Sequence, residues 1–242
     1  MNGLWRVVRQ SAGMVRDLML PRGCAGCDAP DEVLCDDCRD RFAGCEPREL
    51  PCGLMGHAWA CSTYQGVARH AILQWKDHGD EELDGPLCEE IRDLAGRSGL
   101  IDWCRRHDAD GTPIWVVPLP SSARSMRRRG RRHIRPLANA VASRLREAGV
   151  SAVMMPVLRS TASAGRSVEQ STAADRGRRI GGHIVLDERV AKAKDIRGRM
   201  VVLVDDIITT GATMRQCGQV LAGEGACVVT LLALAQTPGQ EE

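Results

Sequence analysis

The stretch that most constrains this 242-residue chain is MVVLVDDIITTGAT, residues 200–213. Its first five residues are apolar without alternation, which is typical of a strand covered on both faces in a parallel sheet. Two adjacent carboxylates, Asp205 and Asp206, follow directly and are expected to end the strand. Apolar residues at helical spacing begin just after Thr213. The stretch therefore predicts a strand, a polar loop and a helix.

The polar part of this stretch is suited to a phosphorylated sugar. Ligands gather at the carboxyl ends of parallel strands, where Asp205 and Asp206 would repel each other unless a ligand engaged both. The 2′ and 3′ hydroxyls of a ribose would do so, and a hydrated Mg²⁺ nearby would relieve the repulsion. The following loop adds hydroxyls and free amides at the mouth of a helix, which favours phosphate. This loop consists of Thr209, Thr210, Gly211, Ala212 and Thr213.

A plain acidic turn before an N-capped helix is the alternative, and it explains neither the paired carboxylates nor the two threonines. The stretch resembles the 5-phosphoribosyl-1-pyrophosphate (PRPP) signature of type I phosphoribosyltransferases: an apolar strand, two acids, two variable residues and TTGAT. It contains neither the G-x4-G-K-[ST] of a P-loop nor the G-x-G-x-x-G of a dinucleotide fold, so those nucleotide-binding classes are excluded for this stretch.

Length and composition limit the class of protein further. A chain of 242 residues fits one medium domain with a small appendage, and its net charge of +2 says little by itself. Of the 33 basic residues, 30 are Arg, the residue type suited to bidentate phosphate contacts. One Tyr, one Phe and five Trp argue against an extended base-stacking platform.

Residues 1–20 mix apolar and basic side chains, which predicts an amphipathic segment rather than a signal peptide. Such a segment more often docks against protein than anchors in a membrane. No run of about 18 apolar residues is present, so membrane insertion is not expected. Eleven cysteines without an export signal indicate reduced thiols or bound metal, and hence a cytoplasmic protein.

Two C-x2-C pairs near the N-terminus, seven residues apart, predict a structural zinc site. Each pair can form a turn that presents two thiolates, and two such turns close a tetrahedral site. The metal ligands would be Cys24, Cys27, Cys35 and Cys38. A polar segment this short needs metal for stability, so residues 21–60 are expected to form a zinc-ribbon-like module. Four unligated thiols are the alternative.

Three further cysteines, Cys45, Cys52 and Cys61, form no regular pair. They are interpreted as non-ligands, with remnants of a second metal knuckle as the alternative. His57 lies among them and is interpreted as an ordinary surface residue.

Apolar strands alternate with helical patterns in the rest of the chain, which predicts an α/β fold with a mainly parallel sheet and flanking helices. The expected strands cover residues 114–117, 153–158 and 227–234, and Pro156 makes the second short or peripheral. The expected helices lie within residues 62–80, 85–95 and 136–148, whereas 96–111 is interpreted as a polar connection. This larger domain would span residues 61–237, with a tail at 238–242.

A basic run occupies residues 124–135, directly behind the strand-end loop that contains Leu119, Pro120 and Ser121. Its seven arginines are uninterrupted by any acid, which suits a pyrophosphate. The same run would bind a nucleic-acid backbone, and a solvated basic loop is a third interpretation. Residues 159–179 are polar and predict a mobile loop, with Gln170 and Arg176 as candidate ligand contacts.

Over residues 18–237 the chain resembles the ComF family, phosphoribosyltransferase-like proteins linked to natural competence and DNA uptake. The resemblance is carried by the four-cysteine module, by Tyr64-Gln65-Gly66 with Lys76, by Val117-Pro118-Leu119-Pro120 with Arg129-Gly130, by Gln170 with Arg176, and by the PRPP signature. Many relatives have Phe-Asn-Gln where this chain has Arg131, Arg132 and His133. It also departs from them at Arg179 and His183, and its further cysteine pairs are incomplete.

The resemblance implies that Asp205 and Asp206 hold the ribose hydroxyls of PRPP and that the loop from Thr209 to Thr213 cradles its 5′-phosphate. Lys76 and the loop at 119–121, with Arg129, would face the pyrophosphate. The expected function is Mg²⁺-dependent phosphoribosyl transfer with release of pyrophosphate. The alternative is a non-catalytic module that senses PRPP or binds single-stranded DNA or competence and recombination proteins.

Overall fold

The computed structural model describes residues 22–107, 111–121, 126–127, 129–161, 184–187, 189–190 and 195–238. The predictions made for residues 1–20, for Gln170 and Arg176, and for most of the tail lie outside the described residues.

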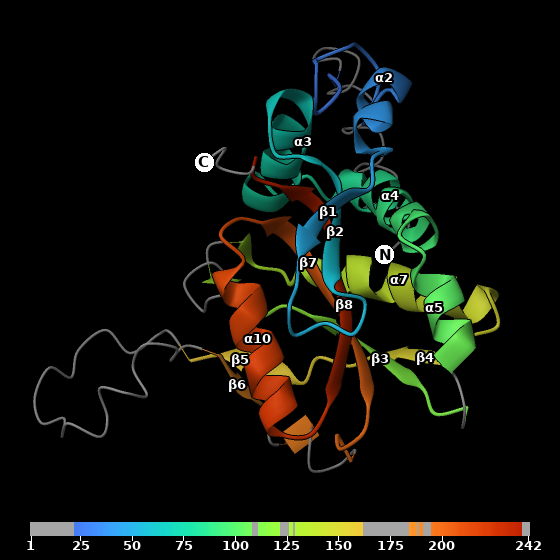
Figure 1. Cartoon of the computed structure of the whole chain (residues 1–242). Coiled ribbons are helices and arrows are strands. Elements are labelled where there is room, and N and C mark those ends of the chain that lie inside the picture. The colour runs from blue at the N-terminus through green and yellow to red at the C-terminus, as the bar shows by residue number, and fades with distance from the viewer. Residues whose placement is uncertain are drawn as a thin grey trace, which may run out of the picture.

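A six-stranded mixed sheet lies at the centre of the described residues (Figure 1). Its strands, in order across the sheet, are β1 (Glu46–Glu49), β2 (His57–Thr63), β8 (Cys227–Gln236), β7 (Met200–Ile208), β3 (Ile114–Pro118) and β4 (Ala152–Met154). The strands from β2 to β4 run parallel to one another, and β1 joins β2 antiparallel. The predicted α/β fold with a mainly parallel sheet is confirmed.

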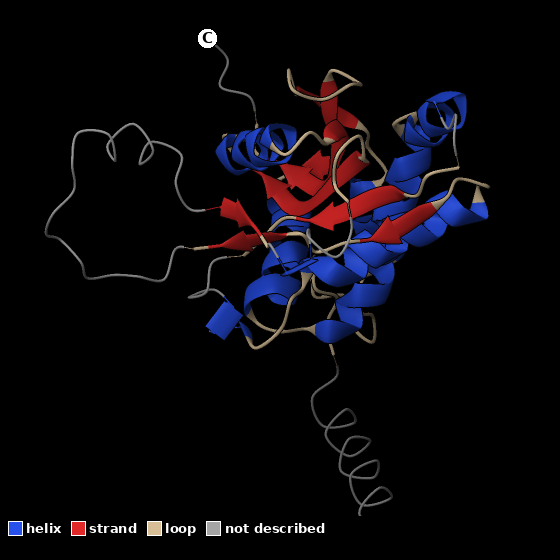
Figure 2. Cartoon of the chain, turned by 90° about the horizontal axis from the view of Figure 1, so that it is seen from below, coloured by secondary structure: helices blue, strands red, loops and turns tan. Residues whose placement is uncertain are grey.

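Helices cover both faces of this sheet (Figure 2). On one side lie α3 (Gly66–Asp77), α4 (Asp84–Arg97), α5 (Leu100–His107) and α7 (Ile134–Glu147), and on the other lies α10 (Ala212–Gly223). Val202 and Val204 of β7 pack in the core on the side of α3, α4, α5 and α7. Val201 and Leu203 pack with α10 on the other side. Because both faces are covered, the central strand is apolar without alternation.

The helix α5 corrects the interpretation of residues 96–111 as a polar connection. Leu100, Ile101 and Cys104 share one buried face of this helix, at spacings of one and three. Trp103 is only half-buried and the remaining positions are polar or charged, so the apolar stripe is too narrow to stand out from a short polar stretch.

The predicted strand at 153–158 is divided in two. β4 lies at the edge of the main sheet, as Pro156 suggested, and β5 (Leu158–Ser160) pairs antiparallel with β6 (Ile184–Leu186) in a separate two-stranded sheet. The chain leaves the main sheet at the proline, which lacks the N–H needed to continue the ladder.

The N-terminal part of the described chain packs on α3 and α4 (Figure 1). It comprises the turns of residues 22–35, α2 (Asp36–Arg39) and the 3-10 helix η1 (Asp40–Phe42). Arg22 forms ion pairs with Asp80 and with Glu82 in η2 (Glu81–Leu83), just beyond α3. The strand β2 crosses the predicted module boundary between residues 60 and 61. Within the described residues, no helix has the length and apolarity needed to cross a bilayer.

The link between this module and the sheet depends on a glycine. A Cβ at Gly44 would lie 2.6 Å from the backbone carbonyl oxygen of Cys61 in β2, which cannot rotate away. We expect Gly44→Ala to lower the free energy of unfolding by about 1–3 kcal/mol, the cost of forced overpacking. Gly85→Ala is the matched control, because a Cβ there meets nothing within 4 Å and alanine favours the helix. Equal stability of the two variants in urea denaturation would contradict this prediction.

Candidate functional site

The carboxyl ends of the parallel strands meet at one edge of the sheet. Register places Thr63, Gln236 and Ile208 side by side on β2, β8 and β7, and places Pro118 of β3 beside Val204 of β7. The amide of Leu119 donates to the carbonyl oxygen of Val204 at 2.8 Å, which holds the loop after β3 against β7. The two predicted loops, 119–121 and 209–213, therefore follow neighbouring strands at the same edge.

The strand β7 does not end before the carboxylates, contrary to the expectation from sequence. It continues to Ile208 because its partner β8 continues to Gln236, so Asp205 pairs with Ala233 within the ladder. Successive residues of a strand direct their side chains to opposite faces, and the two carboxylates accordingly have different surroundings.

Asp206 is buried and accepts two charge-assisted contacts on one oxygen. Its Oδ2 lies 2.5 Å from Nζ of Lys76 at the end of α3 and 2.9 Å from Nε2 of His133 before α7. Burial alone would raise the pKa of Asp206, but the hydrogen bond with His133 and the charge of Lys76 outweigh it and hold this pKa well below its usual range. Asp206 is therefore a permanently ionised acceptor near neutral pH.

Asp205 is half-buried, and its pKa is shifted in the direction opposite to that of Asp206. Burial and the neighbouring charge of Asp206 raise the pKa of Asp205 well above its ordinary value. Its Oδ1 accepts the backbone N–H of Asp206 at 2.8 Å. Asp205 also lines a cavity of about 20 Å³ with the threonine loop, which places this carboxylate beside Thr209 and Thr213.

The threonine loop turns into α10 at Gly211, whose φ of +73° suits a residue without a side chain. Thr209, Thr210 and Thr213 are exposed. The base of the loop is fixed from two sides: Arg48 of β1 donates to the carbonyl oxygen of Thr209, and the amide of Thr237 donates to that of Ile208 at 2.8 Å. This leaves exposed hydroxyls at the start of a 12-residue helix.

The structure separates the arginine run into two groups, a division that the sequence did not reveal. Arg129 donates to Asp77 at 3.0 and 3.1 Å, and Arg131 donates to both carboxylate oxygens of Asp84 at 2.9 and 2.8 Å. Within the described residues, these two guanidinium groups face protein carboxylates. The Trp75 indole also donates to Asp84, at 2.6 Å.

The second group lines a cavity of about 230 Å³ beyond the loop after β3. Its polar lining includes Ser121, Arg132 and Arg135, joined by Arg159 of β5, while prolines and Leu119 supply apolar walls. Burial and the charge of Arg132 lower the pKa of Arg135, so the two cations that line this cavity repel each other. An anion would relieve that repulsion.

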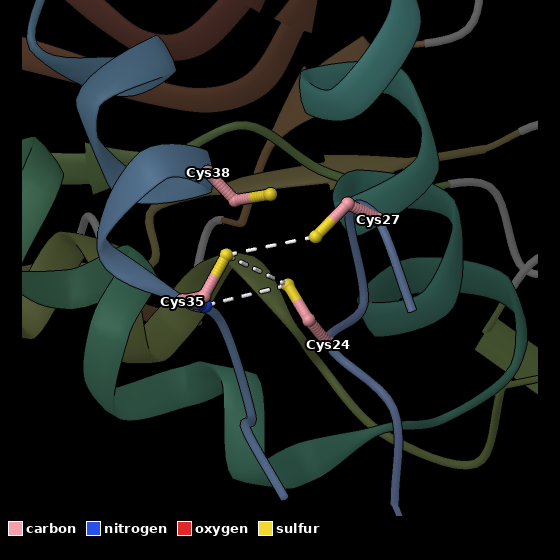
Figure 3. A group of neighbouring side chains, drawn as sticks. All are labelled: Cys24, Cys27, Cys35 and Cys38. Carbon is pink, nitrogen blue, oxygen red and sulfur yellow. Dashed lines mark hydrogen bonds between the residues drawn. The ribbon is translucent and has the colours of Figure 1, made fainter. Parts of the chain in front are cut away.

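Four cysteines converge in the N-terminal module (Figure 3). The sulfur atoms of Cys24, Cys27, Cys35 and Cys38 all lie within 4.8 Å of one another, and Cys35 lies 3.7 Å from Cys24 and 3.6 Å from Cys27. Sulfurs bound tetrahedrally to zinc at ~2.3 Å would be ~3.8 Å apart, so the donor set and its spacing fit zinc.

Backbone amides support a thiolate at this cluster. The amides of Cys35 and Gly26 donate to the Cys24 sulfur at 3.3 and 3.4 Å. Partial burial raises the pKa of Cys24, but these amide hydrogen bonds outweigh it and lower the pKa to about 6. Zinc binds the thiolate form, so these two amide contacts favour the metal-binding state of Cys24.

The other cysteines of the module lie outside this cluster. Cys61 is buried in β2, with its sulfur 3.6 Å from the carbonyl oxygen of Glu90, and Cys52 is exposed beside Gly218 of α10. Cys45 is half-buried, and His57 is exposed with its ring 5.7 Å from that of Trp59. None of the eleven cysteines forms a disulfide.

The site contains one residue that sequence reasoning missed. His133 was noted only as a departure from relatives, yet it is 2 % exposed and hydrogen-bonded to Asp206. Its position as the single aromatic ring within a run of arginines was the available signal.

The opposite pKa shifts of Asp205 and Asp206 predict opposite effects of their substitution on stability. Because folding raises the pKa of Asp205, its charge lowers stability at pH 7, and Asp205→Asn should raise the melting temperature. That advantage should shrink as pH falls toward about 4, because folded wild-type Asp205 takes up its proton at a higher pH than the unfolded chain does.

Asp206→Asn should instead lower the free energy of unfolding by about 3 kcal/mol, since it leaves buried donors without a charged acceptor. Its loss should persist down to about pH 4 and decline below, because the folded-state pKa of Asp206 is depressed. Thermal and urea unfolding at pH 7 and 4 measure both variants, and shifts of the same sign at pH 7 would contradict the assignment.

Residues 90–242 match the family described as phosphoribosyl transferase domain, and this match covers more than half of the chain. None of the curated proteins matches the chain. Among solved structures, the chain is similar to the hypoxanthine-guanine phosphoribosyl transferase of L. donovani, with 14% identity, a TM-score of 0.43, and coverage of 65% of this chain and 72% of that one. The hypoxanthine phosphoribosyl transferase of Trypanosoma cruzi shows 15% identity, a TM-score of 0.41, and coverage of 64% and 76%. On the family match, the chain belongs to the phosphoribosyl transferase domain family.

Proposed function

We propose that the chain binds PRPP with Mg²⁺ at the carboxyl edge of its sheet and transfers the phosphoribosyl group to an acceptor nitrogen. This proposal is supported by the position of Asp205 and Asp206 on β7, directly before the threonine loop, at the same edge of the sheet as the loop after β3, in a chain of this family. The carboxylates that would bind hydroxyls and the helix N-terminus that would bind phosphate then lie on one continuous strand, loop and helix.

In this proposal the loop from Thr209 to Thr213, including Thr210, Gly211 and Ala212, holds the 5′-phosphate. Asp205 shares a cavity with that loop, so it is the carboxylate best placed for a ribose hydroxyl of the same ligand. Asp206 supplies the second acceptor. Because the two side chains leave β7 on opposite faces, the ribose would have to span the end of the strand for each carboxylate to accept from one of two neighbouring hydroxyls, which would fix the sugar ring relative to the phosphate.

The pyrophosphate end would lie over the loop that contains Leu119, Pro120 and Ser121. The cavity beyond this loop supports the assignment, because Arg132, Arg135 and Arg159 line it around an apolar wall. Lys76 contributes positive charge from the ribose side through its contact with Asp206. Arg129, which sequence placed here, would have to leave Asp77 to reach the pyrophosphate.

The proposed transfer requires little covalent chemistry from the side chains of the protein. The acceptor nitrogen forms its bond to C1 of the ribose as the bond from C1 to the pyrophosphate oxygen breaks, through an oxocarbenium-like transition state. Mg²⁺ bound with PRPP would neutralise part of the departing charge. The residues named above hold the sugar in line and stabilise the charge that develops on pyrophosphate.

We further propose that the four-cysteine cluster binds one structural zinc ion and that the chain is a member of the ComF family. Support comes from the spacing of the sulfurs and from the position of the cluster against α3, whose last turn carries Lys76. The family assignment links the proposed activity to DNA uptake and remains a proposal.

A non-catalytic module is the second candidate, either a PRPP sensor or a single-stranded-DNA-binding protein of competence and recombination. The pairing of Arg129 and Arg131 with Asp77 and Asp84 weakens the DNA-binding form, because these guanidinium groups are already engaged. Exposed Arg127 and Arg132 would carry phosphate contacts. DNA affinity that falls steeply with salt and with Arg127→Ala and Arg132→Ala, in a protein without PRPP binding, would establish this candidate.

Calorimetric titration of PRPP with Mg²⁺ tests the main proposal. We expect micromolar binding by the wild type, about −8 kcal/mol, and its loss in Asp205→Asn, a variant that should remain stably folded. Asp93→Asn on the exposed side of α4 is the matched control and should bind as wild type does. Release of pyrophosphate with a panel of nucleobases then tests transfer. A folded wild type that does not bind PRPP would overturn the proposal.

Metal analysis tests the zinc proposal. We expect one zinc ion per chain, and Cys27→Ser should lower this content and destabilise the N-terminal module, because metal binding and folding are coupled. Cys227→Ser changes another exposed cysteine far along the sequence and should leave the zinc content unchanged. Equal zinc loss in both variants, or a wild type purified without zinc that takes up none, would exclude the site.

A further inference from the structure

His133 is a buried polar side chain to which the proposed reaction assigns no task. It precedes α7 within the arginine run, and only 2 % of its surface is exposed. A histidine that merely filled space here would need a partner for its polar ring, because an unpaired buried polar group is costly. Its partner is Asp206, whose Oδ2 lies 2.9 Å from Nε2 of the ring.

The surroundings of His133 fix its ring firmly. Trp75 of α3 packs edge-on against it, with ring centroids 5.0 Å apart and planes at 76°. The Trp75 indole donates to Asp84, which also binds the guanidinium of Arg131, and that guanidinium lies 5.6 Å from the Trp75 ring centroid. The segment 131–133 is thereby attached to α3 and to the start of α4.

The contacts also define which ring nitrogen carries the proton. An ionised carboxylate only accepts hydrogen bonds, and the pKa of Asp206 is held low, so Nε2 must be the donor. Within the described residues, Nδ1 is buried and has no hydrogen-bond partner. The contact with Asp206 therefore requires a proton on Nε2, whereas Nδ1 contacts no described group that would require one.

Both donors meet the same oxygen of Asp206. Nζ of Lys76 lies 2.5 Å from Oδ2, the oxygen that Nε2 of His133 also contacts. Two donors from α3 and from the segment before α7 both engage Oδ2 and so fix the rotation of the carboxylate, which leaves Oδ1 outside these two contacts. Supporting contacts of this kind preorganise binding groups.

We propose that His133 is a positioning residue for the ribose site, holding the Asp206 carboxylate together with Lys76 in the orientation that accepts a ribose hydroxyl. The proposal rests on the proposed PRPP site and adds to it a residue outside the two carboxylates and the loops. It predicts that His133 contributes to the binding of the sugar and not to the binding of the phosphate alone.

The test compares PRPP, ribose 5-phosphate and inorganic phosphate as ligands of three variants. His133→Leu removes the donor and should weaken PRPP and ribose 5-phosphate about tenfold to a hundredfold, the range for a hydrogen bond to a charged group. Competition by inorganic phosphate should be unchanged, whereas structural damage would weaken all three ligands. His133→Gln retains an N–H donor and should recover most of the affinity. His70→Leu, on the exposed side of α3, is the matched control.

The outcomes separate the two proposals. If the wild type and His70→Leu bind PRPP and His133→Leu binds equally well or more tightly, the positioning role is wrong and the PRPP site stands. If the wild type does not bind, the proposed function fails first and the positioning role fails with it. A wild-type measurement covers the case that His133→Leu does not fold: long-range ¹H–¹⁵N correlation should show His133 with its proton on Nε2, and a neutral ring protonated on Nδ1 would overturn the inference.

Discussion

The buried charge of Asp206 is the constraint around which this edge of the sheet is arranged. An isolated ionised carboxylate at 5 % exposure would be costly, so the chain must bring donors to it from elsewhere in the sequence. Lys76 comes from α3 and His133 from the segment before α7, which joins three elements at one oxygen. Such a pair adds little net stability compared with an apolar replacement, but it is strongly directional. Its retention is therefore better explained by the orientation of a binding group than by stability.

The arginine run shows how one composition serves two physical purposes. Arg129 and Arg131 engage Asp77 and Asp84, so they attach the segment to α3 and α4 and present little charge outward. The neighbouring Arg132 and Arg135 line a cavity with partly apolar walls, where a bound anion would lower the repulsion between them. Guanidinium groups suit both tasks because they are planar, always charged and able to bind carboxylate or phosphate in the same fork.

Sequence reasoning succeeded where a feature is local in the chain. The apolar run of β7, the turn at Gly211 and the start of α10 are adjacent, and the paired C-x2-C turns are separated by only seven residues. It failed where the interacting residue is distant in the chain, or where the length of a neighbouring strand determines where a strand ends. The end of β7 depends on the length of β8, and the contact of His133 with Asp206 joins positions 73 residues apart. Neither periodicity nor composition carries that information.

The cysteine module contacts α3, the helix that carries Lys76, and thereby connects the proposed zinc site to Asp206. A Cβ at Gly26, between the first two cysteines, would lie 2.7 Å from Val67 in the first turn of α3. The turn from Cys24 to Cys27 therefore packs directly against the helix. Arg22 forms an ion pair with Asp80, three residues beyond the end of the same helix. Lys76 lies between these two contacts and reaches Asp206. Because the module contacts the first turn of α3 and the segment just beyond its last turn, folding of the cysteine turns and placement of the Asp206 carboxylate are parts of one packing arrangement.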